Sequence, residues 1–215
     1  SGESGGIGAN RNAVLLCAAG GPFVMTDDDI ECRPARLRDT LLKRDPDLCV
    51  LPDMGSVLAS VVPEERDILG EHLRYLADGE TRICSIGFYG ATGASVNRGY
   101  LSLEGPGRES LVGDYDDLRD SPFVIHIPGR DKVCASHELM ACHASYDCAS
   151  VLPPFFTSGR NDDGLFAFMV QLCYPGSKIA YPAFGLFHNP DTLRRYDAGT
   201  RTGFSLTVSE LFMSL

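Results

Sequence analysis

The sequence predicts an α/β fold, because helix-like and strand-like segments alternate along the chain. The helix-like segments carry apolar residues at helical spacing with polar residues or glycine at their ends, and they cover residues 10–19, 35–44, 63–78 and 161–174. The strand-like segments are short apolar runs, and they cover residues 22–26, 47–52, 81–88, 122–127 and 178–188. No internal repeat interrupts this order.

Local signals support the individual elements. The helix at 10–19 is closed by Gly20 and Gly21, and the buried strand 22–26 then follows. The helix at 63–78 has Pro63 at its start, acidic residues in its first turn and Gly79 beyond its end. Residues 89–121 are rich in Gly, Asp and Ser, so we expect an irregular connection there. We expect a last helix over 205–215.

The stretch 134–148 contains three cysteines and two histidines and invites a zinc interpretation. His137 and Glu138 resemble the start of an HExxH motif, but His143 is six residues after His137 rather than four. Such spacing places the two imidazoles on opposite sides of a helix. We therefore interpret 134–148 as a helix with scattered cysteines.

Composition limits the class of protein. At 215 residues, with 44% hydrophobic and 22% charged residues, the chain is long enough for one globular domain over 1–215. A net charge of −10 argues against nucleic acid or an anionic membrane as partner and favours a cation-dependent site. No apolar stretch reaches the length of a membrane-spanning helix. The eight cysteines form no CxxC pair and several lie in apolar runs, which predicts buried free thiols in a reducing compartment, the cytoplasm.

Three aspartates, Asp27, Asp28 and Asp29, directly follow the strand 22–26. Carboxylates at the end of a strand in an α/β sheet lie where such sheets bind ligands, and Mg²⁺ or Mn²⁺ is held there by one or two of them. Alternation places Asp27 and Asp29 on one face and Asp28 elsewhere. A solvated acidic turn is the alternative.

A second acidic pair, Asp162 and Asp163, lies at the predicted start of a helix, beside Arg160. Either Asn161 or Asp162 is a helix N-cap, or one of these carboxylates is a general base toward a hydroxyl. His188 ends the strand 178–188 and is either a structural residue or an added metal ligand. His72 and His126 have no acidic or cysteine partner at ligand spacing.

The order of these stretches resembles family-2-like glycosyltransferases. In that family a Gly-rich lead and an N-R-N helix, here Asn10-Arg11-Asn12, precede a strand and a D-x-D motif, here Asp27-Asp28-Asp29. Residues 160–169, "RNDDGLFAFM", are similar to the motif that supplies the catalytic base, and "FHNP" to the C-terminal histidine of some members. The resemblance covers 5–31 and 153–190 and hardly touches the middle.

The resemblance implies a glycosyltransferase A-type fold, a mixed, mostly parallel sheet flanked by helices in a Rossmann-like domain. The family's first strands precede the N-R-N helix, so we expect the chain to be a fragment. Either a remainder of the same polypeptide or another chain would supply those strands.

The resemblance also implies a nucleotide-sugar donor, a hydroxyl acceptor, Mn²⁺ or Mg²⁺ and inversion at the anomeric carbon. The roles it assigns are Asp27, Asp29 and His188 for metal; Asn10, Arg11, Asp27, Asp28 and Arg160 for donor; and Asp163 or Asp162 for the catalytic base. Two alternatives stay open, a non-catalytic binding module and another magnesium-dependent, nucleotidyl-type transferase.

Overall fold

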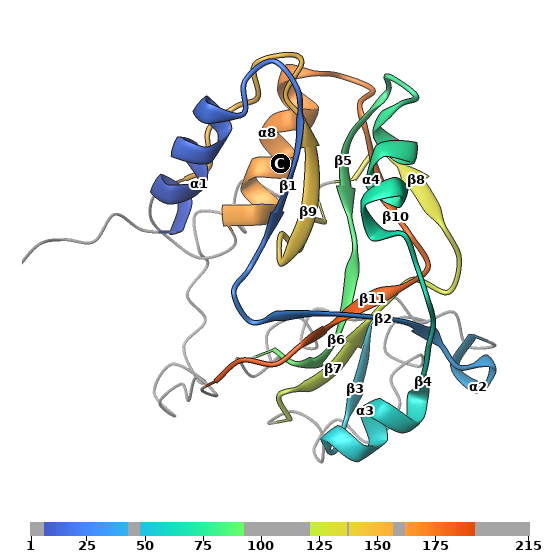
Figure 1. Ribbon diagram of the computed structural model, residues 1–215. Helices are drawn as coiled ribbons and strands as arrows, with labels where there is room; N and C mark the ends of the chain where they lie inside the picture. Colours follow the sequence, from blue (N-terminus) through green and yellow to red (C-terminus); the bar gives the residue numbers. More distant parts are fainter. Residues whose placement is uncertain (1–6, 43–47, 93–120, 137, 157–161, 192–215) are drawn as a thin grey trace, which may run out of the picture.

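The computed structural model describes residues 7–42, 48–92, 121–136, 138–156 and 162–191 (Figure 1). The described residues form an α/β structure with two sheets, so the predicted class is confirmed. Figure 1 shows the strands β1, β9 and β5 running vertically in the upper sheet, while β2 and β11 cross below them.

The five-stranded sheet has the order β1-β9-β5-β10-β8. Its strands are β1 (Pro22–Thr26), β5 (Thr81–Ser85), β8 (Lys132–Cys134), β9 (His143–Asp147) and β10 (Lys178–Tyr181). Helices α1 (Ile7–Cys17) and α8 (Asp162–Cys173) supply Leu15 and Phe166 to the core on one face, and Tyr75 of α4 (Ile68–Leu76) packs with Cys84 and Ala180 on the other. This sheet is therefore covered on both faces.

The six-stranded sheet has the order β3-β7-β6-β11-β2-β4. Its strands are β2 (Ile30–Leu37), β3 (Cys49–Leu51), β4 (Val61–Pro63), β6 (Gly87–Ala91), β7 (Phe123–His126) and β11 (Gly185–His188). Helix α3 (Met54–Ser60) packs Val57 against its core, and the short α2 (Asp39–Leu42) contributes Leu41.

The expectation of a mostly parallel sheet is wrong for the described strands. Only β10–β5 and β11–β6 are parallel, whereas the seven other pairings are antiparallel. The sequence did not reveal this because apolar runs look the same in either direction of pairing.

Three successive passes of the chain lead from the five-stranded to the six-stranded sheet. β1 continues into β2, β5 into β6, and β10 into β11. In the last two of these passes the chain runs from β5 to β6 and from β10 to β11. Ile86, Phe184 and Leu186 from these two segments pack together, and Ile30 packs against them. The first pass is made through Asp27, Asp28 and Asp29, so these aspartates lie at the corner between the sheets.

Several local expectations are confirmed and others need correction. α1 and α8 form where predicted, and Gly20 has a φ of 102° at the turn after α1. β1 is only half-buried, because Pro22, Val24 and Thr26 are exposed. α4 begins at Ile68 with Asp67 as its N-cap, whereas Pro63 ends β4.

Two predicted helices are wrong. Residues 35–44 contain the end of β2, where Ala35 and Leu37 pair with β4, and among those that the structure describes only Asp39–Leu42 are helical. In 134–148 no described residue is helical: Cys134 ends β8, and His143–Asp147 form β9 between β1 and β5. Tertiary pairing overrides helical propensity in both places.

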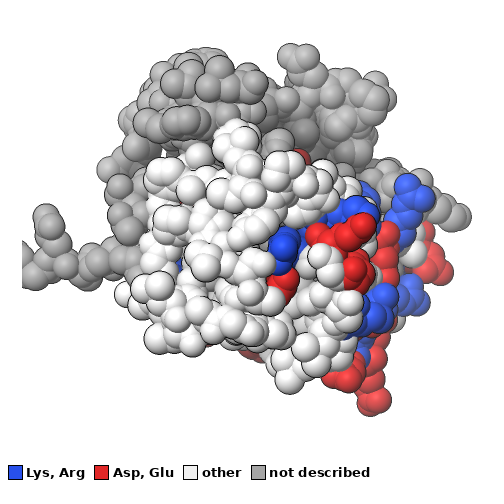
Figure 2. All heavy atoms as spheres, turned by 90° about the horizontal axis from the view of Figure 1, so that it is seen from above, with Lys and Arg blue, Asp and Glu red and all other residues white. Residues whose placement is uncertain are grey.

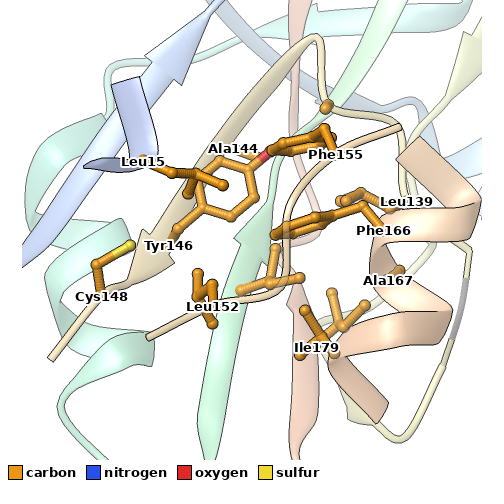
Figure 3. Close-up of a cluster of buried hydrophobic side chains, with 13 residues drawn as sticks. Leu15, Leu139, Ala144, Tyr146, Cys148, Leu152, Phe155, Phe166, Ala167 and Ile179 are labelled. Atoms are coloured by element: carbon orange, nitrogen blue, oxygen red, sulfur yellow. The ribbon is translucent and has the colours of Figure 1, made fainter. Parts of the chain in front are cut away.

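The main core lies between the five-stranded sheet and the helices α1 and α8 (Figure 3). The rings of Phe155 and Phe166 are stacked nearly parallel, with their centres 3.8 Å apart. Both rings pack edge-on against the fully buried Tyr146. All eight cysteines are free, as predicted, but Cys17, Cys32, Cys134 and Cys173 are exposed rather than buried.

Four expectations fall outside the described residues: the helix at 205–215, Arg160, Asn161 as an N-cap, and most of the irregular connection at 89–121. None of the described helices is long and apolar enough to cross a membrane.

Asn12 joins α1 to the segment that carries Phe155. Its side chain donates a hydrogen bond of 2.9 Å to the Phe155 carbonyl oxygen and accepts one of 2.6 Å from the Phe155 N–H. Asn12→Ala leaves both backbone groups without these partners, so we expect the free energy of unfolding to fall by about 1–3 kcal/mol. Chemical denaturation measures this.

Asn10→Ala is the matched control, because Asn10 is exposed on the same helix. We expect it to change the free energy of unfolding by less than about 0.5 kcal/mol. Equal losses in the two variants would contradict the assigned role of Asn12.

Candidate functional site

The guanidinium of Arg11 lies among three carboxylates. It is 3.6 Å from Asp27 and 3.1 Å from Asp162, and it donates a short hydrogen bond to Asp163. Arg11 is only 8% exposed, so its charge is taken from water and must be compensated by these partners. We call Arg11, Asp27, Asp29, Asp162, Asp163 and His188 the acidic corner.

Helix α1 and strand β1 position the first two members. Arg11 points from α1 toward the sheet, with its guanidinium 5.4 Å from the centre of the Phe155 ring. The Asp27 N–H donates to the carbonyl oxygen of Cys142 next to β9, and the Asp27 carbonyl accepts from the Ile30 N–H. These bonds close a turn that carries the three aspartates from β1 into β2.

The start of α8 positions Asp162 and Asp163. Both lie in the first turn of the helix, where the positive end of the helix dipole favours carboxylates. The second oxygen of Asp163 accepts a hydrogen bond of 3.2 Å from the Ala141 N–H. Asp163 is therefore oriented through both of its oxygens, by Arg11 and by Ala141.

Burial sets the proton affinity of this cluster. It raises the pKa of Asp163 to about 6, although Arg11 and the Ala141 N–H act in the opposite direction. Burial also raises the pKa of Asp27, which Arg11 and His188 lower and Asp29 raises further. For Arg11, burial lowers the pKa, but the carboxylates, Asp163 first among them, outweigh this and raise it. Arg11 stays charged.

Asp29 and His188 form the second half of the corner. Oδ2 of Asp29 is 3.3 Å from Nε2 of His188, and His188 is only 6% exposed. Strand β11 brings them together, since His188 is paired with Ile30 and the Asn189 N–H donates to the Asp29 carbonyl. Burial follows the predicted alternation: Asp27 and Asp29 are half-buried and Asp28 is exposed.

On the other side of β11, a glycine allows strand β6 to lie close to His188. Gly90 of β6 has a φ of 134°, and a Cβ at this position would lie 2.1 Å from the His188 carbonyl oxygen. A side chain there would displace β11. The adjacent Ala91 carbonyl oxygen makes a short hydrogen bond with Nδ1 of His188.

These contacts fix which nitrogens of His188 carry hydrogen. A carbonyl oxygen only accepts, so Nδ1 donates to Ala91, and a neutral ring then directs the lone pair of Nε2 at Asp29. In that case Nε2 of His188 and Oδ2 of Asp29 are both acceptors and repel each other. The contact becomes favourable if the ring is charged or if a cation binds both atoms. Oδ1 of Asp29 is also buried without a hydrogen-bond partner. Both features fit a divalent cation, because metal-ligating histidines commonly donate their other N–H to a carbonyl.

Asp27 does not complete a three-ligand set with Asp29 and His188. Among the described residues no group of three or more His, Cys, Asp or Glu side chains is arranged to hold a metal ion. The carboxylate of Asp27 instead pairs with Arg11. Asp29 and His188 thus remain the residues that fit a cation directly, and Asp27 lies beside them.

The remaining predicted site residues stand apart. Asn10 and Asp28 are exposed, and Arg160 lies outside the described residues. Sequence reasoning missed the pairing of Arg11 with Asp162 and Asp163, which are separated from it by more than 150 residues. One signal could have indicated it: Arg11 lies four residues before Leu15, on the same face of the helix, and an arginine on a buried face needs an anion.

Outside the corner, charges of both signs are interspersed. Figure 2 shows Lys and Arg beside Asp and Glu on one side of the visible face, whereas much of the rest of its described part is uncharged. Elsewhere in the described residues, Arg82 pairs with Asp147 at 2.6 Å. The described part of this face thus carries no large patch of a single sign.

Replacing the central cation tests the electrostatic account. Arg11→Met leaves Asp27, Asp162 and Asp163 close together without a positive partner, so we expect a loss of about 2–4 kcal/mol in the free energy of unfolding at pH 7.5. The loss shrinks at pH 5, since Asp163, whose pKa is about 6, is then largely protonated. Denaturation at the two pH values measures both effects.

Arg36→Met is the matched control. Arg36 pairs with Asp39 on the surface, with side chains 43% and 83% exposed. We expect a change below about 1 kcal/mol at either pH. A loss in Arg11→Met that equals the control would refute the role of Arg11.

Comparison with models of known protein families, with curated proteins and with solved structures finds no match for this chain. Its function is therefore argued from the acidic corner alone.

Proposed function

We propose that the acidic corner is the active site of a metal-dependent glycosyltransferase of the A-type, which moves a sugar from a nucleotide-diphosphate donor to a hydroxyl acceptor with inversion. The carrying observation is that one turn holds both Asp27, which pairs with Arg11, and Asp29, which pairs with His188, while Arg11 also binds Asp163. A candidate base and a candidate cation site thus adjoin.

Asp163 suits the role of general base. Its pKa of about 6 leaves the carboxylate mostly ionised at neutral pH yet more basic than an exposed aspartate. Each carboxylate oxygen has a second lone pair, so Asp163 can accept a proton while Arg11 and the Ala141 N–H hold it. In the proposed step Asp163 takes the proton of the acceptor hydroxyl.

The bonds then change as follows. The acceptor oxygen attacks the anomeric carbon of the donor, and the bond from that carbon to the diphosphate oxygen breaks. The electron pair leaves with the nucleoside diphosphate, whose negative charge therefore increases. Arg11, with Asp27 beside it, is the cationic side chain of the acidic corner and can attract this charge.

Asp29 and His188 would hold the metal, with Asp27 completing the set after it shifts from Arg11. A divalent cation at this place neutralises the charge that develops on the leaving diphosphate. Mg²⁺ and Mn²⁺ suit the two carboxylates, and Mn²⁺ also accepts imidazole. Asp28, exposed at the tip of the turn, would face the ribose or the sugar.

A non-catalytic binding module is the second candidate, and one observation favours it. Asp27, Asp162 and Asp163 are all already paired with Arg11, so a single side chain compensates the acids that catalysis requires. Such a module would bind a nucleotide diphosphate but would not turn over sugar donors.

Metal binding is tested first. We expect Asp29→Ala to weaken Mn²⁺ binding at least about tenfold, because it removes one of the two groups that fit the cation. Asp28→Ala is the matched control, since this neighbouring carboxylate is exposed. Isothermal titration of each variant gives the dissociation constants, and unchanged Mn²⁺ affinity in Asp29→Ala would eliminate the metal assignment.

The base is tested by turnover. We expect Asp163→Asn to lower the rate of sugar release from nucleotide-diphosphate sugars by about 100-fold or more while donor affinity is retained. In the wild type the base must be deprotonated, so the rate falls about tenfold per pH unit below the pKa of about 6 and levels off above it.

The matched control for this variant is Asp162→Asn, which keeps the helix start and the contact between Arg11 and Asp163. Near-normal turnover in Asp163→Asn would exclude it as the base. Nucleotide binding without turnover in the wild type would select the non-catalytic module.

A further inference from the structure

Two histidines are buried against each other on the face of the five-stranded sheet opposite Arg11. His72 of α4 is 1% exposed and His143 at the start of β9 is 9% exposed. Their ring centres are 5.0 Å apart and the rings are tilted by 46°. The proposed transferase chemistry uses neither of them.

None of the four ring nitrogens of this pair has a hydrogen-bond partner among the described residues. A neutral imidazole carries one donor and one acceptor, and buried polar groups are nearly always satisfied. Nearby, the Ser145 hydroxyl on the same side of β9 is also buried without a partner. Three side chains from two elements thus present unsatisfied polar atoms in one region of the interior.

Both imidazoles of the pair are in the protonation state that a metal ion requires. Burial lowers the pKa of both histidines to about 4, and for His72 the neighbouring His143 lowers it further. Both rings are therefore neutral at pH 7 and can offer lone pairs without first losing a proton. Imidazole nitrogen is a preferred ligand of zinc, copper, nickel and cobalt rather than of magnesium.

The separation of the rings also fits one metal ion. A zinc–nitrogen bond of about 2.0–2.1 Å places each ring centre about 3.2 Å from the metal, and a tetrahedral angle then separates the centres by about 5 Å. The observed separation is 5.0 Å. Cys84 is paired with Ser145 across the strands, and burial raises the pKa of its thiol to about 12, which disfavours the thiolate in the metal-free protein.

We propose that His72 and His143 form a second metal site, for a borderline-soft divalent cation such as Zn²⁺, that is distinct from the acidic corner. The two imidazoles are its nitrogen ligands, and among the described residues no set of three or more His, Cys, Asp or Glu side chains is arranged to hold a metal ion. The Ser145 hydroxyl or a water molecule completes the coordination.

The position of this pair gives such a site a structural effect. It joins α4 to the start of β9, and the residues just before His143 hold the acidic corner: the Ala141 N–H binds Asp163 and the Cys142 carbonyl binds the Asp27 N–H. A metal that ties His143 to α4 therefore stabilises the strand end that orients both acids.

The experiment uses the full chain after removal of metal by a chelator and alkylation of the exposed thiols. Asp29→Ala serves as the background, because it removes the hard-cation site. We expect Zn²⁺ to raise the melting temperature of this background by several degrees, as a ligand of the folded state does. Adding His72→Phe weakens Zn²⁺ affinity at least tenfold, whereas adding His126→Phe, a change at a half-buried histidine of β7, leaves the affinity unchanged.

Co²⁺ provides a second readout that needs no histidine variant. In the alkylated background, intense visible absorption without thiolate charge-transfer bands indicates four-coordinate cobalt bound through nitrogen and oxygen.

The proposal is overturned if Zn²⁺ does not raise the melting temperature of the background, if His72→Phe keeps full affinity, or if the Co²⁺ spectrum shows thiolate bands. If His72→Phe does not fold, the Zn²⁺ affinity of His143→Gln and the cobalt spectrum of the background test the proposal instead. Because the Asp29→Ala background already lacks the carboxylate site, this result does not depend on whether the proposed transferase activity exists.

Discussion

The charge of Arg11 is the constraint on which the acidic corner depends. A buried guanidinium requires anions, and Asp27, Asp162 and Asp163 provide them from two distant segments. Conversely, carboxylates brought this close would repel each other without a cation. This mutual requirement fixes α1 against the start of α8 and against the end of β1, so one ion-pair cluster both holds the fold together and assembles the candidate site.

The passage of the chain between the two sheets explains why the second half of the site lies next to the first. β1 ends at the aspartates and the chain turns into β2, whose first residue pairs with His188 at the end of β11. Asp29 thus meets His188 at the corner, while Asp27 remains with Arg11. A nucleotide diphosphate at this corner would compete with the carboxylates for the positive charge of Arg11, which links occupancy of the site to the position of α1.

The sequence predicted the members of the corner better than the architecture around them. Asp27, Asp29 and His188 stand at the ends of strongly patterned strands, so their convergence followed from general properties of α/β sheets. The pairing directions did not, because apolar runs carry no sign of direction. β9 was missed since His143–Asp147 contains small and polar residues whose burial depends on β1, β5 and α4. The link from Arg11 to α8 depends on tertiary structure alone, and a single sequence does not display it.

Calorimetric titration of a nucleoside diphosphate, with and without Mn²⁺, tests the central claim most directly. If the acidic corner holds a metal–diphosphate, the nucleotide binds the wild-type chain only when Mn²⁺ is present, and Arg11→Met alters its affinity. Tight binding without any divalent cation, or no binding in its presence, would contradict the account.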